Sequence, residues 1–234
     1  MSLPVFITPD PARGELDGAE GRHAVTVKRI AVGERIMLVD GAGTAAEVTV
    51  TEIRGKDLLR GEVLGLTQVP KPTPRVTVVQ AIPKADRAEL AVDLAVQGGA
   101  DAIVPWISQR TIARWPADKQ AKQVAKWQAV AREAAKQSRR AWVPQVAEPV
   151  TTNQLRERVV GKQALVLHED AKRSITDIEF ADEVFVIVGP EGGIGPEELE
   201  SLGAEAVKLG PEVLRTASAG LAALCAIGAV TGRW

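Results

Sequence analysis

The sequence predicts an α/β protein: a small strand-rich N-terminal domain followed by a C-terminal domain built on a parallel sheet. Three observations support this prediction. Short runs of Val, Ile and Thr, separated by turn residues, fill the region before Val69. Three prolines within Pro70–Pro74 form a stiff linker. An unbroken apolar run at Val184–Val188 leads directly into a glycine loop, which is typical of a strand buried on both faces of a parallel sheet.

For the N-terminal domain, residues 1–70, we expect a small β-barrel. Asp40–Gly43 and Arg54–Asp57 have the composition of hairpin connections. Between the first strands, Gly21–Ile30 can form a short helix. The expected strands are Phe6–Thr8, Arg35–Val39, Ala45–Ile53 and Leu58–Leu64.

The short helix would display a group of basic side chains. They are Arg22, His23, Lys28 and Arg29. Such a group is either an ordinary solvated surface or a contact for a polyanion. The remainder of this domain is net acidic, so a local basic group favours the second interpretation.

The C-terminal domain, residues 75–234, alternates strands and helices. The elements expected before the glycine loop are a strand at Val76–Ile82, a helix at Ala85–Gln97, a strand at Ala102–Trp106, a helix at Ala117–Arg140 and a strand at Gln163–Leu167. This alternation predicts parallel strands that are joined by helical crossovers.

The longest expected helix, Ala117–Arg140, carries two stripes. Trp127 lies on an apolar stripe, where it is better interpreted as core than as a platform for a base. Arg132, Lys136 and Arg140 recur every four residues on another face, and no acid intervenes on that face. This row is either solvated surface or, as we favour, a face for phosphate groups.

Charge is unevenly distributed along the chain. The net charge is −1, but nine Lys or Arg stand against two acids in residues 110–140, and eleven acids stand against two bases in residues 169–205. This segregation predicts one face for a polyanion and another for a different ligand.

Cysteine and histidine usage limits the possible chemistry. Cys225 is the single cysteine, so the chain can form no internal disulfide, and a cytoplasmic location is favoured. We expect this thiol to be buried and inert. With only two histidines, a His/Cys zinc site is disfavoured and no metal is expected. The N-terminal residues have the features of neither a signal peptide nor a membrane span.

The glycine loop Gly189–Gly193 sits where open α/β sheets bind ligands, at the carboxyl end of a strand. Gly195 can cap the next helix, and Pro196 suits its first position. The loop lacks the spacing of a dinucleotide or P-loop motif, and Glu191, Glu197 and Glu198 crowd the place where a phosphate would lie. A flat, uncharged or cationic ligand and a plain turn without a ligand both remain open.

A second stretch follows the same pattern. Ala206–Leu209 is expected to be a strand, Gly210-Pro211 turns the chain, and Leu214-Arg215-Thr216 leads into a helix of small residues at Ala217–Val230. The combination of GPEGG, LG-x-x-x-LR and this helix resembles the SPOUT class of RNA methyltransferases. Within that class the chain resembles the ribosomal RNA small subunit methyltransferase E family, over nearly its whole length.

Three further motifs carry this resemblance. Pro83, Lys84, Arg87 and Glu89 match the family's P-K-x-x-R-x-E, and His23 with Arg29 matches H-x-x-x-x-x-R. The third motif is E-A-x-x-Q-S-x-R-x-x-x-P, matched at Glu133, Gln137, Ser138, Arg140 and Pro144. Where the family has a glutamate after L-R-x, this chain has Ala217.

The resemblance implies a PUA-like N-terminal barrel that helps to bind RNA, and a SPOUT domain with a deep trefoil knot within about residues 163–234. It implies S-adenosylmethionine as cofactor, 16S rRNA of the small ribosomal subunit as partner, and a homodimer. The implied reaction is methylation at N3 of a uridine, which is uracil 1498 in the family.

The resemblance also assigns residues. Those implied for the cofactor are Leu167, His168, Glu169, Gly189, Pro190, Glu191, Gly192, Gly193, Leu209, Gly210, Val213, Leu214, Thr216 and Ala219. Those expected to contact RNA are Arg22, His23, Lys28, Arg29, Lys84, Arg87, Arg110, Arg132, Lys136, Arg139 and Arg140. Taken alone, His168 is better explained as a polar strand end than as a general base.

Arg215 is the candidate catalytic residue. An arginine beside O2 or O4 of uracil would stabilise the anion that forms as N3 loses its proton. The alternative role for Arg215 is an ion pair with a nearby acid such as Glu191. Two other functions compete with methyl transfer: an RNA-binding assembly factor that has lost catalysis, consistent with Ala217, and a nucleotide-dependent oxidoreductase, which the missing phosphate loop disfavours.

Overall fold

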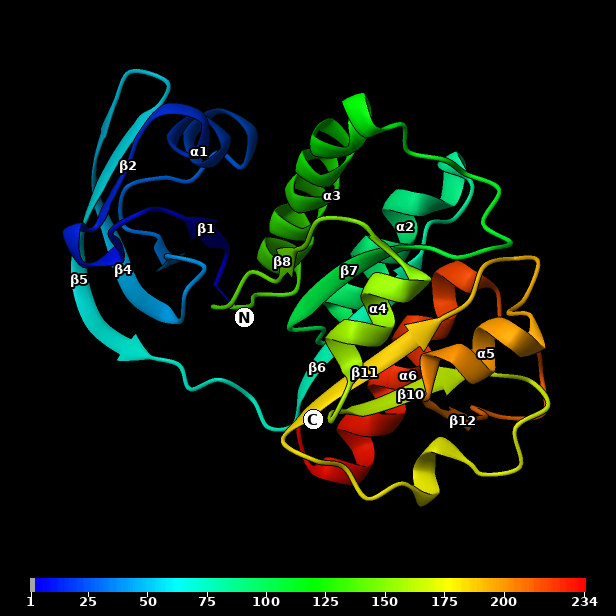
Figure 1. Cartoon of the computed structure of the whole chain (residues 1–234). Helices are drawn as coiled ribbons and strands as arrows, with labels where there is room; N and C mark the ends of the chain where they lie inside the picture. The colour runs from blue at the N-terminus through cyan, green and yellow to red at the C-terminus, as the bar shows by residue number, and fades with distance from the viewer. Residues whose placement is uncertain (1–2) are drawn as a thin grey trace. The chain divides into compact units, whose positions relative to one another are not determined.

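The computed structural model describes residues 3–234. Its chain divides into two compact units: Met1–Lys71 with Ala135–Val143, and Pro72–Ala134 with Pro144–Trp234. The segment 135–143 therefore belongs to the first unit although it follows the linker by more than sixty residues. Figure 1 traces the whole chain from its N-terminus in blue to its C-terminus in red.

The first unit is built on a curved five-stranded sheet with the order β1-β3-β4-β5-β2 (Figure 1). Its strands are β1 (Val5–Ile7), β2 (Glu15–Leu16), β3 (Arg35–Val39), β4 (Thr44–Arg54) and β5 (Leu58–Gln68). β1 pairs with β3 in parallel, and the other pairs are antiparallel. The predicted strands are present, but β5 continues past Leu64 to Gln68, and β2 was not predicted.

The helix predicted at Gly21–Ile30 is shifted and divided. The chain forms a 3-10 turn at Pro11–Arg13, the helix α1 at Gly18–Arg22 and a π-helical turn at His23–Val27. The predicted C-terminal boundary is wrong because Arg29 adopts a left-handed backbone with φ 55°, and the Ile30 N–H returns to the Ala24 carbonyl at 3.0 Å. That bond closes the end of the helix.

The first unit has its own core, and the segment 135–143 is anchored beside its strands. Phe6, Ile36 and Leu38 are fully buried between the sheet and the short helices. The indole N–H of Trp142 donates a hydrogen bond to the Val69 carbonyl at 3.0 Å. At Gly43, with φ 101°, an added Cβ would lie 2.4 Å from a carbon of the Trp142 ring, so only glycine lets the ring approach.

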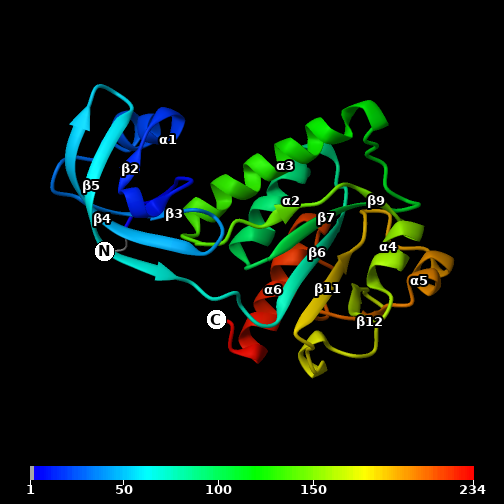
Figure 2. The same ribbon diagram turned by 60° about the vertical axis from the view of Figure 1, so that its left-hand side comes forward.

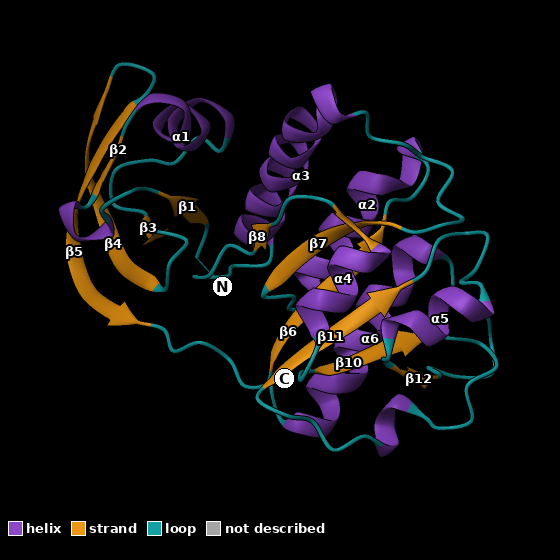
Figure 3. Cartoon of the chain, in the orientation of Figure 1, coloured by secondary structure: helices purple, strands orange, loops and turns teal. Residues whose placement is uncertain are grey.

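The second unit contains a seven-stranded parallel sheet in which β12-β10-β11-β6-β7-β8 are neighbours and β9 also pairs with β7 (Figure 3). The strands are β6 (Arg75–Ala81), β7 (Ala102–Ile107), β8 (Gln145–Val146), β9 (Val150–Thr151), β10 (Gln163–Leu167), β11 (Glu183–Val188) and β12 (Glu205–Val207). β11 lies between two parallel partners and is buried from Val184 to Val188, which confirms the predicted central strand.

Helices cover both faces of this sheet (Figure 2). They are α2 (Ala85–Gln97), α3 (Ala117–Gln137), α4 (Thr152–Val159), α5 (Pro196–Leu202) and α6 (Thr216–Thr231), with a 3-10 turn at Ile175–Asp177. α4 and α5 bury Leu155 and Leu202 against one face. α6 approaches the other face at Gly220, where an added Cβ would lie 3.5 Å from Val78.

Two predicted boundaries in this unit need correction, and three elements were missed. α3 ends at Gln137 rather than Arg140, because Arg139 adopts φ 57° and the Arg140 N–H bonds to the Ala135 carbonyl at 2.9 Å. The last strand is Glu205–Val207, not Ala206–Leu209. The helix α4 and the two-residue strands β8 and β9 were not predicted.

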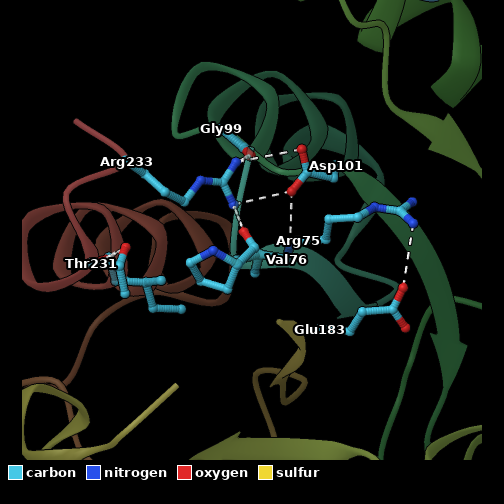
Figure 4. A network of polar contacts seen from close by, with 9 residues as sticks. Arg75, Val76, Gly99, Asp101, Glu183, Thr231 and Arg233 are labelled. Carbon is cyan, nitrogen blue, oxygen red and sulfur yellow. Dashed lines mark hydrogen bonds and ion pairs between the residues drawn. The ribbon is translucent and has the colours of Figure 1, made fainter. Parts of the chain in front are cut away.

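The C-terminus of the chain is fixed to the beginning of the second unit by Arg233 (Figure 4). Its guanidinium donates hydrogen bonds to the carbonyls of Pro74 and Gly99 and lies 3.1 Å from an oxygen of Asp101. Asp101 also accepts the backbone N–H of Val76 at 2.7 Å. The Arg233 and Asp101 side chains are only 7% and 10% exposed, so the pair is largely buried.

Candidate functional site

Three loops at the carboxyl edge of the parallel sheet line one cavity of about 760 Å³. They follow the neighbouring strands β10, β11 and β12, and they place Leu167–Asp170, Val188–Ile194 and Lys208–Arg215 around it. Arg87 at the start of α2 and Arg110 after β7 complete the rim. The carboxyl edge is where open parallel sheets bind ligands. Every residue assigned from the sequence to the cofactor, and Arg215, lines this cavity.

The glycine loop is shaped by close contacts and a tight turn. The Gly193 N–H donates to the Pro190 carbonyl at 2.9 Å, and Gly193 has φ 71°, a conformation that glycine adopts without strain. At Gly189 an added Cβ would lie 2.9 Å from the Ile194 side chain. Gly195 then caps α5 and Pro196 occupies its first turn, as predicted.

The second loop ends at Arg215, which is the N-cap residue of α6. The Ser218 and Ala219 N–H groups donate to the Arg215 carbonyl at 2.9 and 3.0 Å, so the backbone of Arg215 is fixed while its side chain is exposed. Among the described residues no ion pair joins Arg215 to Glu191 or to another acid. The guanidinium is therefore available to a ligand at the rim of the cavity.

The two residues before Arg215 are apolar and exposed. Val213 is 74% exposed and Leu214 is 41% exposed, and both line the cavity. Apolar side chains gathered at a concave site mark a surface that a ligand covers.

The histidine at the end of β10 has a local structural role. The His168 N–H donates to the Val207 carbonyl at 3.0 Å, and its Nδ1 accepts the Asp170 N–H at 3.2 Å. Nδ1 is therefore an acceptor that holds the turn after β10. This geometry agrees with the interpretation of His168 as a polar strand end.

Charged side chains of both signs line the cavity. The acids are Glu169, Asp170, Glu191 and Glu212, and the bases are Arg87, Arg110, Lys208 and Arg215. The sequence did not assign Asp170, Lys208 or Glu212 to the site, nor Val188, Ile194, Pro196 and Pro211. They lie in the same three loops as the assigned residues, and this position was the signal that could have identified them.

The prediction that three glutamates crowd the glycine loop is wrong for two of them. Of the three, Glu191 lines the cavity, and its carboxylate accepts the Lys84 N–H at 3.4 Å. Glu197 is exposed on the first turn of α5, outside the lining. Glu198 is fully buried and points away into the protein.

Glu198 connects three segments behind the cavity. Its Oε1 accepts the Gln109 N–H at 2.8 Å and the Thr152 hydroxyl at 2.6 Å. Its Oε2 is buried and has no hydrogen-bond partner among the described residues. The next residue after Gln109 is Arg110, whose Nη1 donates to the Gly192 carbonyl at 3.2 Å. Glu198 thus fixes the loop that holds Arg110 against the glycine loop.

The residues predicted to bind RNA fall into separate groups. Arg87 and Arg110 line the large cavity, and Lys84 lies beside it through its contact with Glu191. In the first unit, His23, Lys28, Lys136 and Arg139 line a smaller cavity of about 230 Å³. Arg22 and Arg29 are exposed, and Arg132 is half-buried.

The predicted row of three cations on one helix face is wrong. Arg140 lies beyond the end of α3, so it does not continue the row. The Lys136 side chain is only 3% exposed, and its Nζ forms an ion pair with Glu20 at 2.9 Å. Residue spacing alone could not reveal this outcome. The helix ends because of the left-handed backbone at Arg139, and Glu20, the partner of Lys136, is distant in sequence. Trp127 is buried in the core, as predicted.

Cys225 is half-buried on α6 rather than fully buried. Desolvation raises the pKa of its thiol, because burial disfavours the thiolate, so this residue is not an activated nucleophile. Within residues 3–234, no group of three His, Cys, Asp or Glu side chains is arranged to hold a metal ion. No helix in that range is long and apolar enough to cross a membrane.

Comparisons with known proteins match both units. A family described as an RNA methyltransferase domain matches residues 69–228, and one described as an RNA methyltransferase PUA domain matches residues 16–64. Ribosomal RNA small subunit methyltransferase E of Mycobacterium bovis is 47% identical over 94% of this chain and 87% of its own length. The Bacillus subtilis protein of that name is 28% identical over 91% of this chain and 88% of its own.

Solved structures agree with these relatives. Ribosomal RNA small subunit methyltransferase E of Neisseria gonorrhoeae, bound to S-adenosyl methionine, has a TM-score of 0.86, 28% identity and 98% coverage of both chains. A putative methyltransferase of Legionella pneumophila, with the cofactor SAM bound, has a TM-score of 0.85, 26% identity and 98% coverage of both chains. From its sequence and its fold, this chain belongs to the ribosomal RNA small subunit methyltransferase E family.

Proposed function

We propose that this chain transfers a methyl group from S-adenosylmethionine to N3 of a uridine in the 16S rRNA of the small ribosomal subunit. The observation that carries the proposal is the convergence of the loops after β10, β11 and β12 on one cavity that contains Arg215. Family membership supports methylation of small-subunit rRNA, and the names of the two similar structures support the cofactor.

The cavity fits S-adenosylmethionine in size and chemistry. Its volume of about 760 Å³ lies within the range of about 300 to 1,000 Å³ that small-molecule sites occupy. Val213 and Leu214 offer apolar surface for a flat ring, and the glycine loop offers backbone groups without side chains. When bound, the cofactor supplies an electrophilic methyl group on a positively charged sulfonium. Glu169, Asp170, Glu191 and Glu212 place negative charge around the same space.

The reaction forms an N3–methyl bond on uracil and releases the N3 proton. Because N3 lies on the Watson–Crick edge, the base must be unpaired or turned out of its stack. The chain contributes chiefly alignment of the reacting groups, an effect that can be worth about 7 to 11 kcal/mol. Arg215, exposed at the rim, is suited to stabilise negative charge on O2 or O4 of uracil as the proton leaves.

Replacing Arg215 tests this role. We expect Arg215→Ala to reduce methyl transfer to small subunits that lack the modification by about 100-fold or more, the usual effect of removing one such donor. Binding of S-adenosylmethionine, measured by calorimetry, should persist. Arg156→Ala is the matched control, because Arg156 is exposed on α4 and does not line the cavity. Wild-type turnover by Arg215→Ala would refute the role of Arg215.

A non-catalytic assembly factor is the second candidate function, and one observation favours it. Ala217, which replaces the family's glutamate, is 4% exposed and does not line the cavity, so it offers no carboxylate to accept the N3 proton. Incubation of unmodified small subunits with labelled S-adenosylmethionine separates the two functions. Label in 16S rRNA supports the enzyme, whereas cofactor binding without transfer supports the assembly factor.

A further inference from the structure

The first unit has a cavity of its own, far smaller than the one between the loops of the parallel sheet. Its volume is about 230 Å³. Pro4, Val5 and Phe6 at the start of the chain form its apolar wall. The polar part of the lining comes from the π-helical turn and from residues 135–143: His23, Lys28, Lys136, Gln137 and Arg139.

The basic side chain of Lys136 is held beside this cavity by contacts within the protein. Lys136 Nζ lies at the cavity with its side chain 3% exposed, held by Glu20 at 2.9 Å and by His23 Nδ1 at 3.4 Å. The His23 ring packs edge-on against Phe6, with ring centroids 5.9 Å apart. These contacts fix the position of one positive charge before any ligand binds.

Two exposed cations, Lys28 and Arg139, complete the lining. Among the described residues that line this cavity none is acidic, and the charge of Glu20 is already paired with Lys136. The cavity therefore carries an excess of positive charge, which an anionic group would offset.

Arg139 occupies a backbone conformation that does not suit it. Its φ of 57° is left-handed, where glycine is favoured and a side chain adds strain. The turn is closed by the Arg139 N–H to the Lys136 carbonyl at 3.1 Å and by the Arg140 N–H to the Ala135 carbonyl. An arginine at such a helix end is costly for folding, and it places its guanidinium at the cavity.

We propose that this cavity binds a phosphate group of an RNA strand, with the attached ribose or base against the apolar wall. The proposal rests on the proposed function in taking RNA as the partner. It assigns the first unit a specific anchoring point that is separate from the cofactor cavity. Phosphate contacts of this kind fix the register of a strand without reading its sequence.

Two substitutions test the cavity with little risk to folding. Arg139→Gly removes the guanidinium and relieves the strain of a side chain on a left-handed backbone. Lys28→Ala removes an exposed charge. Lys56→Ala is the matched control, since Lys56 is an exposed cation of the same unit that does not line the cavity. Lys136 is not replaced, because its loss would leave the half-buried carboxylate of Glu20 without its ion-pair partner.

The measurement is fluorescence anisotropy with a labelled single-stranded RNA oligonucleotide, titrated at several salt concentrations. We expect each cavity variant to bind about fivefold more weakly than wild type and the slope of log affinity against log salt to fall by about 0.7. Arg139→Gly should melt no lower than wild type. Lys56→Ala should change the affinity by less than about twofold.

Equal losses in Lys56→Ala and the cavity variants would show diffuse attraction and overturn the proposal, as would wild-type affinity in the cavity variants. The proposed methyl transfer is tested separately. The cavity variants should still bind S-adenosylmethionine and methylate small subunits when RNA is saturating. If the wild-type protein bound RNA through this cavity yet transferred no methyl group, the proposed function would fail and the phosphate site would stand.

Discussion

Glu198 is a carboxylate with no exposed surface, and only one of its two oxygens has partners. Burying a charge is costly unless hydrogen bonds compensate. Here the Gln109 N–H and the Thr152 hydroxyl supply them, and the start of α5 adds favourable helix-dipole charge. The arrangement joins α4, α5 and the loop after β7 at one point behind the cofactor cavity.

Replacing this carboxylate should therefore destabilise the second unit. We expect Glu198→Ala to lower the free energy of unfolding by about 2 to 4 kcal/mol, because two partly buried hydrogen bonds are lost and a void remains at a fully buried side chain. Glu197→Ala, on the exposed neighbour, should change it by less than about 0.5 kcal/mol. Urea denaturation followed by circular dichroism measures both. Similar small changes in the two variants would show that Glu198 does not join these segments.

The adjacent glutamates also show the limit of sequence reasoning at this scale. The start of α5 could be predicted from Gly195 and Pro196, because capping chemistry is local. Which glutamate turns inward could not, since the donor to the Glu198 carboxylate is the N–H of Gln109, about ninety residues away. The glycine loop and Arg215 line the cavity, the first at the end of a predicted strand and the second at a position assigned through the family motif; their roles stay predictions.

Among elements, α6 depends on contacts at both of its ends. Its first turn is capped by the Arg215 carbonyl, and just beyond its last turn Arg233 binds Pro74, Gly99 and Asp101. The helix also buries Ala223, Leu224 and Ile227, so the terminal contacts add to this packing and fix the two ends of α6.

Breaking the contact beyond the last turn should be costly. We expect Arg233→Ala to lower the free energy of unfolding by about 3 to 5 kcal/mol, since it removes the guanidinium from the largely buried carboxylate of Asp101 and from the carbonyls of Pro74 and Gly99. The matched control is Arg173→Ala, which removes an ion pair to Glu205 whose side chains are 48% and 45% exposed. That pair should contribute at most about 1 kcal/mol. If calorimetry gave equal melting temperatures for the two variants, the importance of the Arg233 contact would be refuted.

Element boundaries were predictable where a local signal exists. α4 was missed although it has one: the Thr151 and Gln154 side chains form a capping box with each other's backbone N–H groups. The end of α3 has no such signal, because an arginine rather than a glycine takes the left-handed position. The strands β2, β8 and β9, each of two residues, are too short to show a periodic pattern.

At the scale of the molecule, the cavity proposed to bind S-adenosylmethionine lies entirely within one unit. Addition of S-adenosylmethionine should therefore slow hydrogen exchange in residues 167–170, 188–194 and 208–216, and leave the amides of residues 3–71 unchanged. A ligand at 100 times its dissociation constant stabilises its site by about 2.7 kcal/mol, which is roughly 100-fold in exchange rate. Exchange measured by mass spectrometry checks this. Protection confined to the first unit would contradict the assignment of the cavity.

The two-part architecture and the parallel sheet follow from local patterns of apolar residues, and these predictions are confirmed. The knot is different. It depends on how the chain passes through its own loops, which neither composition nor periodicity encodes, so it stays a prediction. The homodimer stays one as well. The assignment of 135–143 to the first unit also escaped the sequence, because its anchor, Trp142 beside Gly43, is a contact across about a hundred residues.

The contact between Trp142 and Gly43 can form only after the ribosome has synthesised about a hundred residues beyond Gly43. A nascent chain that has emerged only as far as the linker contains all five strands of the first unit but lacks Trp142, which bonds to Val69 and packs on Gly43. The first unit is complete only once translation has passed Val143, beyond the first sixty residues of the second unit. A fragment ending at Lys71 should accordingly be less stable than the same residues in the whole chain.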